Sequence, residues 1–458
     1  MSRRILALAW PSIATNVTTP LMAMVDLAIV GHLGGMTSIG AVAMGGAMFN
    51  MLYWLTNFLR MGTSGFTAQA HGCGDKDAMA GTLARALAVA LVLSLPMIAF
   101  SDFIADGMQT FMAPEGGETV RQARRYFGIS IWGAPAVLAT YSLSGWFTGM
   151  QDTRPVLLMA VVQNVLNIIL SLALVYTFGL DIEGVALGTA VSQWVGAGTG
   201  LIVSSELRRR AALPSLRKAI RHAGVSLGRF FRVNGDIFLR TLCLVCVTLW
   251  FTRQGARIGA DVLAANALLM QLFMLFSFFM DGFAFAGEAL AGHFYGASDE
   301  SSLRRCVRLL LLWGLALSAI VSLLYAVGGD VILDILTDDA TVIAAAEQYL
   351  PWASAVPICG FMAFVWDGVF VGLTLTRQML ASMAAATLVF FVIDAEMPAF
   401  GIKDITLTAN DLLWLAFNAY LLCRGLVQAS IFVRRCNRQR HRPVSSGAAI
   451  HKNRHGHT

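Results

Sequence analysis

The sequence predicts an all-α polytopic membrane protein, with twelve transmembrane helices arranged as two pseudo-symmetric six-helix bundles. Of the 458 residues, 57% are hydrophobic and only 13% are charged, which is about half the charged share that is usual in soluble domains. The mean hydropathy is +0.67. Twelve long apolar runs follow one another, and the two halves of the chain repeat each other. These observations exclude a water-soluble enzyme, a disordered chain and a disulfide scaffold.

Each apolar run is long enough to cross the hydrocarbon core of a bilayer, about 30 Å thick, as a helix. Lipid offers no hydrogen-bond partners to a free backbone, so these runs must be helical, and no alternating pattern indicates a barrel. Because no cleavage site followed by a soluble domain appears after Met1, we expect the first run to be a retained span. The runs cover residues 10–30, 44–66, 83–104, 129–148, 155–177, 185–205, 237–252, 263–285, 307–327, 352–373, 379–399 and 412–433.

Basic residues predict the orientation of these spans. With the N-terminus in the cytoplasm, 24 of the 33 Lys and Arg residues lie in inner segments and only six lie in outer loops. Both termini are then cytoplasmic. The net charge of +6 reflects this topology and gives no reason to expect nucleic acid as a partner. The expected parts are a first bundle (1–206), a basic linker (207–235), a second bundle (236–433) and a disordered basic tail (434–458).

An internal repeat supports the two bundles. A shift of 224 residues places Gly35 on Gly259, Phe49 on Phe273, Gly72 on Gly296 and Asp75 on Asp299, and a shift of 223 places Gly149 on Gly372. Six helices per half give both halves the same direction in the membrane, so an axis along the membrane normal should relate them. Two such bundles are typical of transporters that work by alternating access. The alternative is that a duplication merely enlarged a membrane protein.

The first span contains the clearest charge inside the membrane, Asp26. A charge at the bilayer centre costs about 2.5–3.5 kcal/mol on insertion scales, so it usually marks function. No Lys or Arg lies within helical reach of Asp26 on this span. Pro11 and Pro20 interrupt the same helix, and each removes a backbone hydrogen bond and permits bending.

Polar side chains on other spans lie at the depth of Asp26 and predict a hydrated pocket. They form stripes at helical spacing, and membrane-embedded polar groups face the bundle interior. The alternative for any one of them is an ordinary hydrogen bond between helices. The pocket candidates are Met22, Asn57, Met61, Asn164, Asn167, Ser171 and Thr189.

The second half carries different charges. The repeat places Trp250 where the first half has Asp26, so the acid is not duplicated. Asp281, Glu288 and Asp367 lie towards the inner ends of their spans, where they either act in gating or form structural pairs with Arg60, Arg240 or Arg424. Asp236 and Arg240 are spaced i, i+4 and should pair with each other.

No enzyme or metal site is evident in the sequence. The seven Cys lie mostly in apolar or cytoplasmic segments, which does not favour disulfides. Neither H-E-x-x-H nor G-x-S-x-G occurs, and His32, His71 and His293 lack the spacing of metal ligands. We therefore expect no catalytic residue, no metal and no cofactor apart from a coupling ion.

Several segments resemble the multidrug and toxic compound extrusion (MATE) family, in particular its DNA-damage-inducible (DinF-like) branch. The resemblance covers nearly the whole chain. It is carried by Leu8-Ala-Trp-Pro11, Val25-Asp26-Leu-Ala-Ile-Val-Gly-His-Leu-Gly34, Phe58-Leu-Arg-Met-Gly-Thr-Ser-Gly-Phe-Thr-Ala-Gln69, Asn164-Val-Leu-Asn167, Asp236-Ile-Phe-Leu-Arg-Thr-Leu-Cys243, Ala264-Ala-Asn266 and Trp366-Asp-Gly368.

The resemblance implies a V-shaped exporter that exchanges organic compounds for inward H⁺ or Na⁺. It maps the family's first-helix acid to Asp26, its bending proline to Pro11, and its pocket Asn and Thr to Asn167 and Thr189. Related members often carry a second acid on the fifth helix, and Ser171 stands there in this chain, which argues against Na⁺ coupling. We expect an efflux antiporter for cationic amphipathic compounds, monomeric in the bilayer. The alternative is a flippase for lipid-linked precursors, which the scarcity of mid-span Arg and Lys disfavours.

Overall fold

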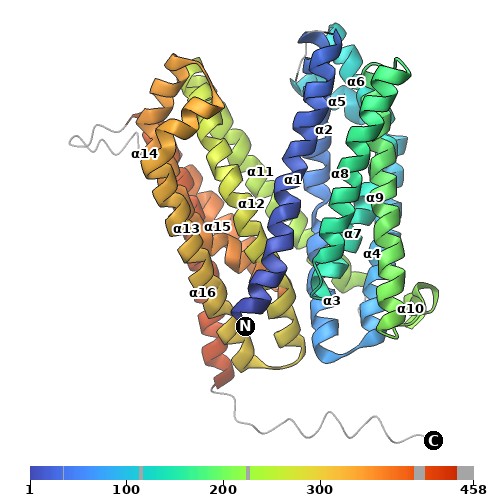
Figure 1. Ribbon diagram of the computed structural model, residues 1–458. Helices are drawn as coiled ribbons and strands as arrows, with labels where there is room; N and C mark the ends of the chain where they lie inside the picture. The colour runs from blue at the N-terminus through green and yellow to red at the C-terminus, as the bar shows by residue number, and fades with distance from the viewer. Residues whose placement is uncertain (35, 113–116, 223–226, 397–407, 441–458) are drawn as a thin grey trace, which may run out of the picture.

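A computed structural model describes residues 1–34, 36–112, 117–222, 227–396 and 408–440 of the chain. All regular elements in these residues are helices. Figure 1 shows them in two arms that diverge at one end and converge at the end where the N-terminus lies. Helices from the first half of the chain make up one arm, and helices from the second half make up the other.

The first half contains α1 (Ser2–Gly34), α2 (Met36–Thr56), α3 (Phe58–Cys73), α4 (Lys76–Ala99), α5 (Ser101–Met112), α6 (Glu118–Ser130), the 3₁₀ turn η1 (Ile131–Gly133), α7 (Ala134–Gly149), α8 (Arg154–Leu172), the π-helical turn η2 (Ala173–Thr177) and α9 (Ile182–Arg210). The short α10 (Leu216–His222) follows. The second half contains α11 (Leu227–Ile258), α12 (Ala260–Gly296), α13 (Glu300–Leu336), α14 (Ala340–Gly372), α15 (Thr376–Glu396) and α16 (Ala409–Arg440).

Ten helical segments within these residues are long and apolar enough to cross a membrane. They include the run predicted at 44–66, which is divided into α2 and α3 by a turn at Asn57. The run predicted at 129–148 corresponds to η1 and α7, with α6 leading into them. Several helices extend well beyond their apolar runs, because polar residues at the ends of a span can continue the helix outside the hydrocarbon.

The segments around the predicted linker and tail are more helical than expected. α9 continues through the arginines to Arg210, α10 occupies part of the linker, and α11 begins before the next apolar run. α10 packs against α4. The tail was predicted to be disordered from residue 434, but residues 434–440 continue α16, and 441–458 lie outside the described residues.

Two helices that the 224-residue repeat relates, α4 and α13, begin in the same way. Asp75 precedes α4 and its side chain accepts a hydrogen bond from the amide of Ala78 at 2.9 Å, while Asp299 precedes α13 and accepts one from the amide of Ser302 at 3.0 Å. A residue with positive φ stands before each cap, Gly74 at 71° and Ser298 at 58°. Since a side-chain acceptor satisfies an amide that the first helical turn leaves free, the same local signal starts both helices.

Helix crossings are also repeated. A Cβ on Gly145 of α7 would lie 2.2 Å from the carbonyl oxygen of Arg60 in α3, and a Cβ on Gly368 of α14 would lie 2.1 Å from that of Ala284 in α12. Residues 60 and 284 are 224 apart, and residues 145 and 368 are 223 apart. The two crossings are therefore equivalent, and each depends on a glycine that lets two backbones touch.

The two arms meet where α3 crosses α12. A Cβ on Gly72 would lie 2.0 Å from the carbonyl oxygen of His293, and one on Gly296 would lie 2.1 Å from that of Gln69. Each contact is the image of the other under the 224-residue repeat. This reciprocal packing joins the halves at the convergent end of the molecule.

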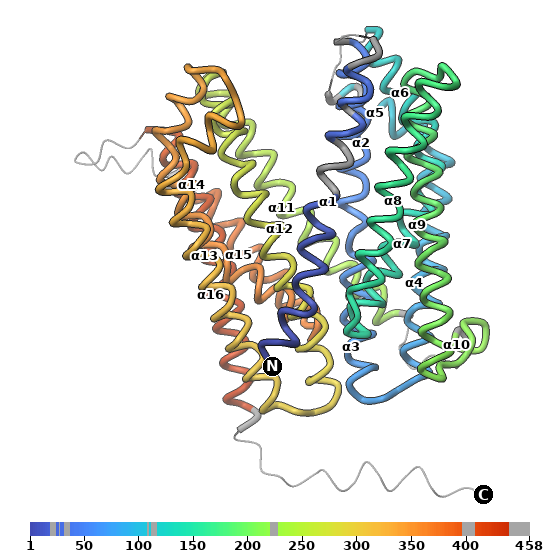
Figure 2. The backbone as a smooth tube through the Cα atoms, viewed as in Figure 1, coloured from blue at the N-terminus to red at the C-terminus, as the bar shows by residue number. Residues whose placement is uncertain are grey.

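α1 connects this junction to the divergent end, as the tube in Figure 2 shows. Its first turns pack against α12, where a Cβ on Gly282 would lie 2.4 Å from Ile13, and it also packs against α8 and α2. The helix is continuous from Ser2 to Gly34 in this conformation, and the role of Pro11 and Pro20 in bending it stays a prediction. Neighbouring helices support it on both sides, which compensates for the backbone hydrogen bonds that the prolines cannot make.

Candidate functional site

Asp26 lies inside the helix bundle. Its exposed fraction is 4%, although α1 is otherwise apolar around it. Within the described residues it takes part in no ion pair, and its Oδ1 has no hydrogen-bond partner. A carboxyl group in this setting is unusual, because buried charges are normally paired.

The neighbours of this carboxyl are neutral polar groups from α8 and α9. The side chains of Thr189, Asn167 and Ser171 interact with it. Asn167 Nδ2 donates to Thr189 Oγ1 at 3.0 Å, and Thr189 Oγ1 donates to the carbonyl of Val185 at 2.9 Å. The prediction that Asn167, Ser171 and Thr189 gather at the depth of Asp26 therefore agrees with the structure.

Several polar atoms of this cluster lack a hydrogen-bond partner. Asn167 Oδ1 and Ser171 Oγ are buried and have no partner among the described residues, like Asp26 Oδ1. An unpaired buried acceptor costs about 1–3 kcal/mol. A proton on the carboxyl would turn one acceptor into a donor and satisfy an oxygen beside it. The geometry thus suits a group that gains and loses a small cation.

Close helix packing holds the cluster together. A Cβ on Gly188 of α9 would lie 2.8 Å from Ser171 Oγ, so only glycine allows α9 to approach α8 this closely. The sequence reasoning missed Tyr126 of α6, which is 5% exposed and interacts with both Asp26 and Thr189. Tyr126 precedes the predicted fourth span, so no periodic signal marked it as part of this pocket.

Two of the remaining pocket candidates make contacts of their own. Asn164 Nδ2 donates to the carbonyl of Thr18 at 3.2 Å and ties α8 to α1. Asn57 forms the turn between α2 and α3 and accepts from Arg60 Nε at 3.2 Å, and its part in a polar pocket stays a prediction. Met61 is buried on α3. The side chains of Met22 and Pro20 lie outside the described part of the structure.

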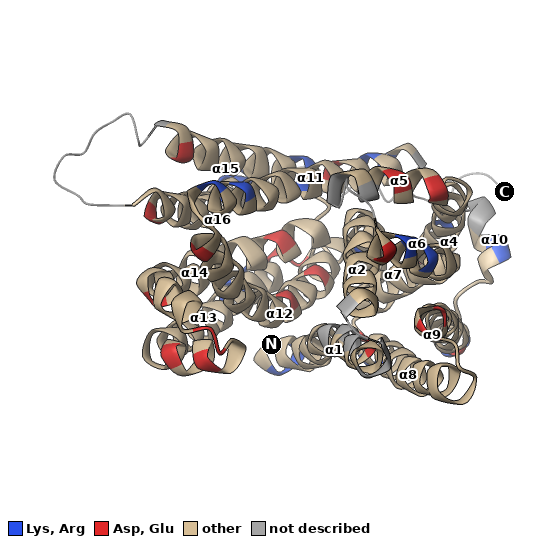
Figure 3. Ribbon diagram, turned by 90° about the horizontal axis from the view of Figure 1, so that it is seen from above, with Lys and Arg blue, Asp and Glu red and all other residues tan. Residues whose placement is uncertain are grey.

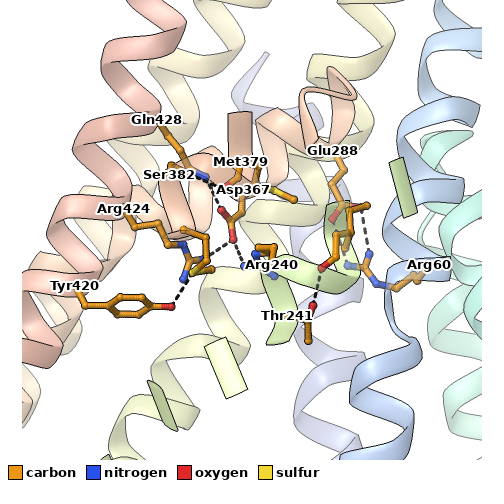
Figure 4. Close-up of polar contacts among 12 residues, drawn as sticks. Arg60, Arg240, Thr241, Glu288, Asp367, Met379, Ser382, Tyr420, Arg424 and Gln428 are labelled. Carbon is orange, nitrogen blue, oxygen red and sulfur yellow. Dashed lines mark hydrogen bonds and ion pairs between the residues drawn. The ribbon is translucent and has the colours of Figure 1, made fainter. Parts of the chain in front are cut away.

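A second charged centre bridges the two arms. Arg60 of α3 and Glu288 of α12 form a two-point pair, with Nη1 to Oε2 at 3.1 Å and Nη2 to Oε1 at 3.3 Å (Figure 4). The Arg60 guanidinium also lies 4.0 Å from the centre of the Phe285 ring. This pair is one of those expected for the second-half acids, and it links the halves directly.

Asp367 of α14 is held by three side chains from two other helices. Arg240 of α11 and Arg424 of α16 donate to its Oδ2, and Gln428 Nε2 donates to its Oδ1 at 2.8 Å (Figure 4). The prediction that Arg240 pairs with Asp236 is wrong. Asp236 instead accepts from Thr376 Oγ1 at 2.8 Å, because Asp367 offers Arg240 a more deeply buried carboxylate.

Asp281 differs from these two acids. It shares one face of α12 with Phe285 and Glu288, at spacings of four and seven residues, and it is partly exposed. Within the described residues it has no salt bridge.

The imidazoles of His71 and His293 also meet across the arms, with ring centres 5.0 Å apart, a contact that the sequence did not indicate.

Comparison with known proteins agrees with this architecture. The MatE family model matches residues 11–173 and 237–395. The chain is 34% identical over 434 residues to DNA damage-inducible protein F of Escherichia coli K12, covering 93% of this chain and 91% of that protein. It is 27% identical over 392 residues to a probable multidrug resistance protein NorM of Xanthomonas axonopodis, covering 81% of each.

A solved structure has the same fold. The outward-facing conformation of a multidrug resistance MATE family transporter aligns with a TM-score of 0.81 at 18% identity, over 95% of this chain and 96% of that one. The family match, the relative in E. coli and the many apolar helices lead to one conclusion. The chain belongs to the MatE family, whose members are membrane transporters and not enzymes.

Proposed function

We propose that this protein is a secondary active multidrug efflux transporter that exports cationic, amphipathic organic compounds in exchange for H⁺. The observation that carries the proposal is the Asp26 carboxyl, buried on a membrane helix without an ion pair in the described residues. The names of the relatives, DNA damage-inducible protein F and NorM, support export of organic compounds as the function.

The proposed topology has twelve crossings in two six-helix bundles, with both termini in the cytoplasm of a bacterial inner membrane. Ten crossings are the apolar helical segments, and α1 and the segment from α6 to α7 supply the other two. The excess of Lys and Arg on one side supports the orientation of the helices in the membrane. The repeated helix caps and glycine crossings support the structural equivalence of the two halves. We propose that one chain is sufficient and that it needs no cofactor.

The coupling uses one carboxyl group for two tasks. Deprotonated, Asp26 attracts a cationic cargo or the amide of Asn167. Protonated, it loses that attraction, and α1 bends near Pro11 as cargo leaves outward. The proton gradient thus biases an equilibrium between two conformations. The absence of a second carboxyl at Ser171 supports H⁺ over Na⁺, because Na⁺ sites usually require several anionic or carbonyl oxygens.

The arms would alternate between opening outward and inward about the α3–α12 junction. Arg60 and Glu288 lie on opposite arms and contact each other in this conformation. We propose that the pair keeps the inner side closed and separates when that side opens.

The test is transport by purified protein in proteoliposomes with an Asp26→Asn variant. Export of a dye-like cation under an imposed pH gradient should fall at least tenfold, because the amide cannot exchange a proton. Asp26→Glu should retain part of the activity. The matched control is Asp181→Asn, an exposed aspartate before α9 whose side chain makes no cap hydrogen bond.

The gradient itself distinguishes the coupling ions. Wild-type protein should respond to a pH gradient and ignore an imposed Na⁺ gradient. Undiminished export by Asp26→Asn would show that Asp26 is not part of the mechanism. Export driven by a Na⁺ gradient alone would show that Na⁺, and not H⁺, is the coupling ion.

A further inference from the structure

The outer wall of the second arm contains a groove that the proposed transport cycle does not use. It has a volume of about 380 Å³, and all of its lining residues come from α13, α14 and α16. Figure 3 shows these helices on the side of the molecule away from α8 and α9. The groove therefore faces the surrounding membrane.

The body of the groove is apolar and open. Leu312 and Leu315 of α13 form one rim and are 52% and 43% exposed, and Val433 of α16, on the other side, is 54% exposed. Phe361 and Met362 of α14 form its floor. In a bilayer such a surface contacts hydrocarbon, so its natural occupant is an acyl chain.

One end of the groove is basic. Arg304 and Arg308, in the first turns of α13, line it. Arg304 is fixed by Glu300 Oε1 at 2.7 Å and by the carbonyl of Cys436 at 3.4 Å. Arg308 is exposed and forms no salt bridge within the described part of the chain, so its charge is free for a ligand.

The basic end lies at the depth of a lipid headgroup. Arg308 is eight residues into α13, or about 12 Å along the helix axis, and Trp366 is six residues before the end of α14, or about 9 Å. Trp366 lines the groove at this level. Trp366 is only 3% exposed, so the arginines mark the level of the headgroups: basic pockets between helices on the cytoplasmic side bind acidic headgroups.

We infer that this groove is a binding site for an anionic phospholipid of the cytoplasmic leaflet. The phosphate and the acidic headgroup lie at Arg304 and Arg308, and an acyl chain follows Leu312 and Leu315. The assignment to the cytoplasmic leaflet rests on the proposed topology. A zwitterionic lipid fills the apolar groove equally well but carries no net charge to complement the arginines.

The site adjoins the buried charges of the second arm. Trp366 precedes Asp367 in α14, and Phe432 of the groove follows Gln428 of α16 by one helical turn. A lipid in the groove would therefore contact α13, α14 and α16 together. This contact lies next to Asp367, which connects α14 with α11 and α16. Its binding should stabilise the folded protein.

The experiment measures lipid binding without any transport assay, so it is independent of the proposed function. Delipidated, detergent-purified protein is titrated with dioleoylphosphatidylglycerol or dioleoylphosphatidylcholine, and bound lipid is counted by native mass spectrometry alongside the melting temperature. The wild type should retain phosphatidylglycerol preferentially and melt at a higher temperature with it. Arg308→Gln should weaken retention about fivefold, and Arg304→Gln/Arg308→Gln by more, as expected for basic residues beside an acidic headgroup.

Two controls make the result specific. Arg305→Gln removes an exposed charge from the same turn of α13 outside the groove and should change nothing. Leu315→Trp should fill the groove and reduce retention of both lipids, whereas Leu323→Trp, at a 65% exposed position farther along α13, should not. Equal loss in Arg305→Gln, or unchanged phosphatidylglycerol binding in the double variant, would overturn the assignment.

Discussion

The two halves of the molecule treat a buried carboxyl group in opposite ways. In the first half, Asp26 is surrounded by neutral hydroxyl and amide groups. In the second half, Asp367 is held by two guanidinium groups and an amide from α11 and α16. The difference shows that shared architecture does not imply shared chemistry: the charge of Asp367 is balanced inside the protein, whereas Asp26 has no ion-pair partner among the described residues.

The position equivalent to Asp26 illustrates this divergence. Trp250 stands there, and its Nε1 donates to Asp394 Oδ2 at 2.8 Å, to which Gln254 also donates at 2.9 Å. The second half thus places a hydrogen-bonded aromatic residue where the first half has an acid. In the proposed mechanism, the first half handles the coupling ion and the second half has no equivalent acid at this position.

The largest expected effect is on stability, from Asp367→Asn. Removing this carboxylate leaves Arg240 and Arg424 buried without a balancing charge, which typically costs about 3–5 kcal/mol. The melting temperature of the purified protein should fall strongly, and yield with it. Asp26→Asn should leave the melting temperature nearly unchanged, because it removes no ion pair. If the two variants had similar melting temperatures, the two carboxyl groups would not differ in their contribution to stability, and the contrast drawn between the halves would be wrong.

An intermediate effect is expected at the pair that connects the halves. Glu288→Gln should destabilise the protein by about 1.5–3 kcal/mol, the range for hydrogen bonds to charged groups. The exchange Arg60→Glu/Glu288→Arg should recover part of the loss caused by Arg60→Glu or Glu288→Arg alone, and a double-mutant cycle of these three variants on the melting curves measures the coupling. A recovery near zero would mean that Arg60 and Glu288 do not interact as a pair between the arms.

The smallest effect is expected at the two equivalent helix caps. Asp299→Ala and Asp75→Ala should each lower the melting temperature slightly and by similar amounts, because each removes one N-terminal acceptor. Hydrogen bonds from Ser302 and Ser301 lower the pKa of Asp299. Its cap is therefore complete at neutral pH, and its contribution disappears only as the pH falls below the ordinary aspartate range through that lowered value. Clearly unequal effects at neutral pH would show that the halves differ even in local structure.

Much of the fold could be predicted from the sequence because its signals are local. Apolar runs predict where helices cross a membrane, and the 224-residue repeat could be found by aligning the chain with itself. Asp26 was found because a lone charge in an apolar run is conspicuous, and Asn167, Ser171 and Thr189 because helical spacing and depth can be counted along the chain.

The charged partners were harder to predict. Sequence spacing pairs Arg240 with Asp236, and the structure pairs it with Asp367, 127 residues away. Asn57 shared the helical stripe of a single expected span, but a turn at Asn57 divides that span and directs its side chain to Arg60. Tyr126 gave no signal, because its position in the pocket depends on how α6 packs.

The sequence by itself determined that this chain is a duplicated helical membrane protein with an acid in its first span and no Lys or Arg within helical reach on that span, because hydrophobicity, repeat length and local spacing are properties of the linear chain. Only the tertiary structure decided which charges are compensated. Ion pairing depends on distances of a few ångströms between helices, and those distances follow from glycine crossings such as Gly72 on His293 and Gly188 on Ser171. That packing leaves Asp26 without an ion pair among the described residues and gives Glu288 and Asp367 theirs.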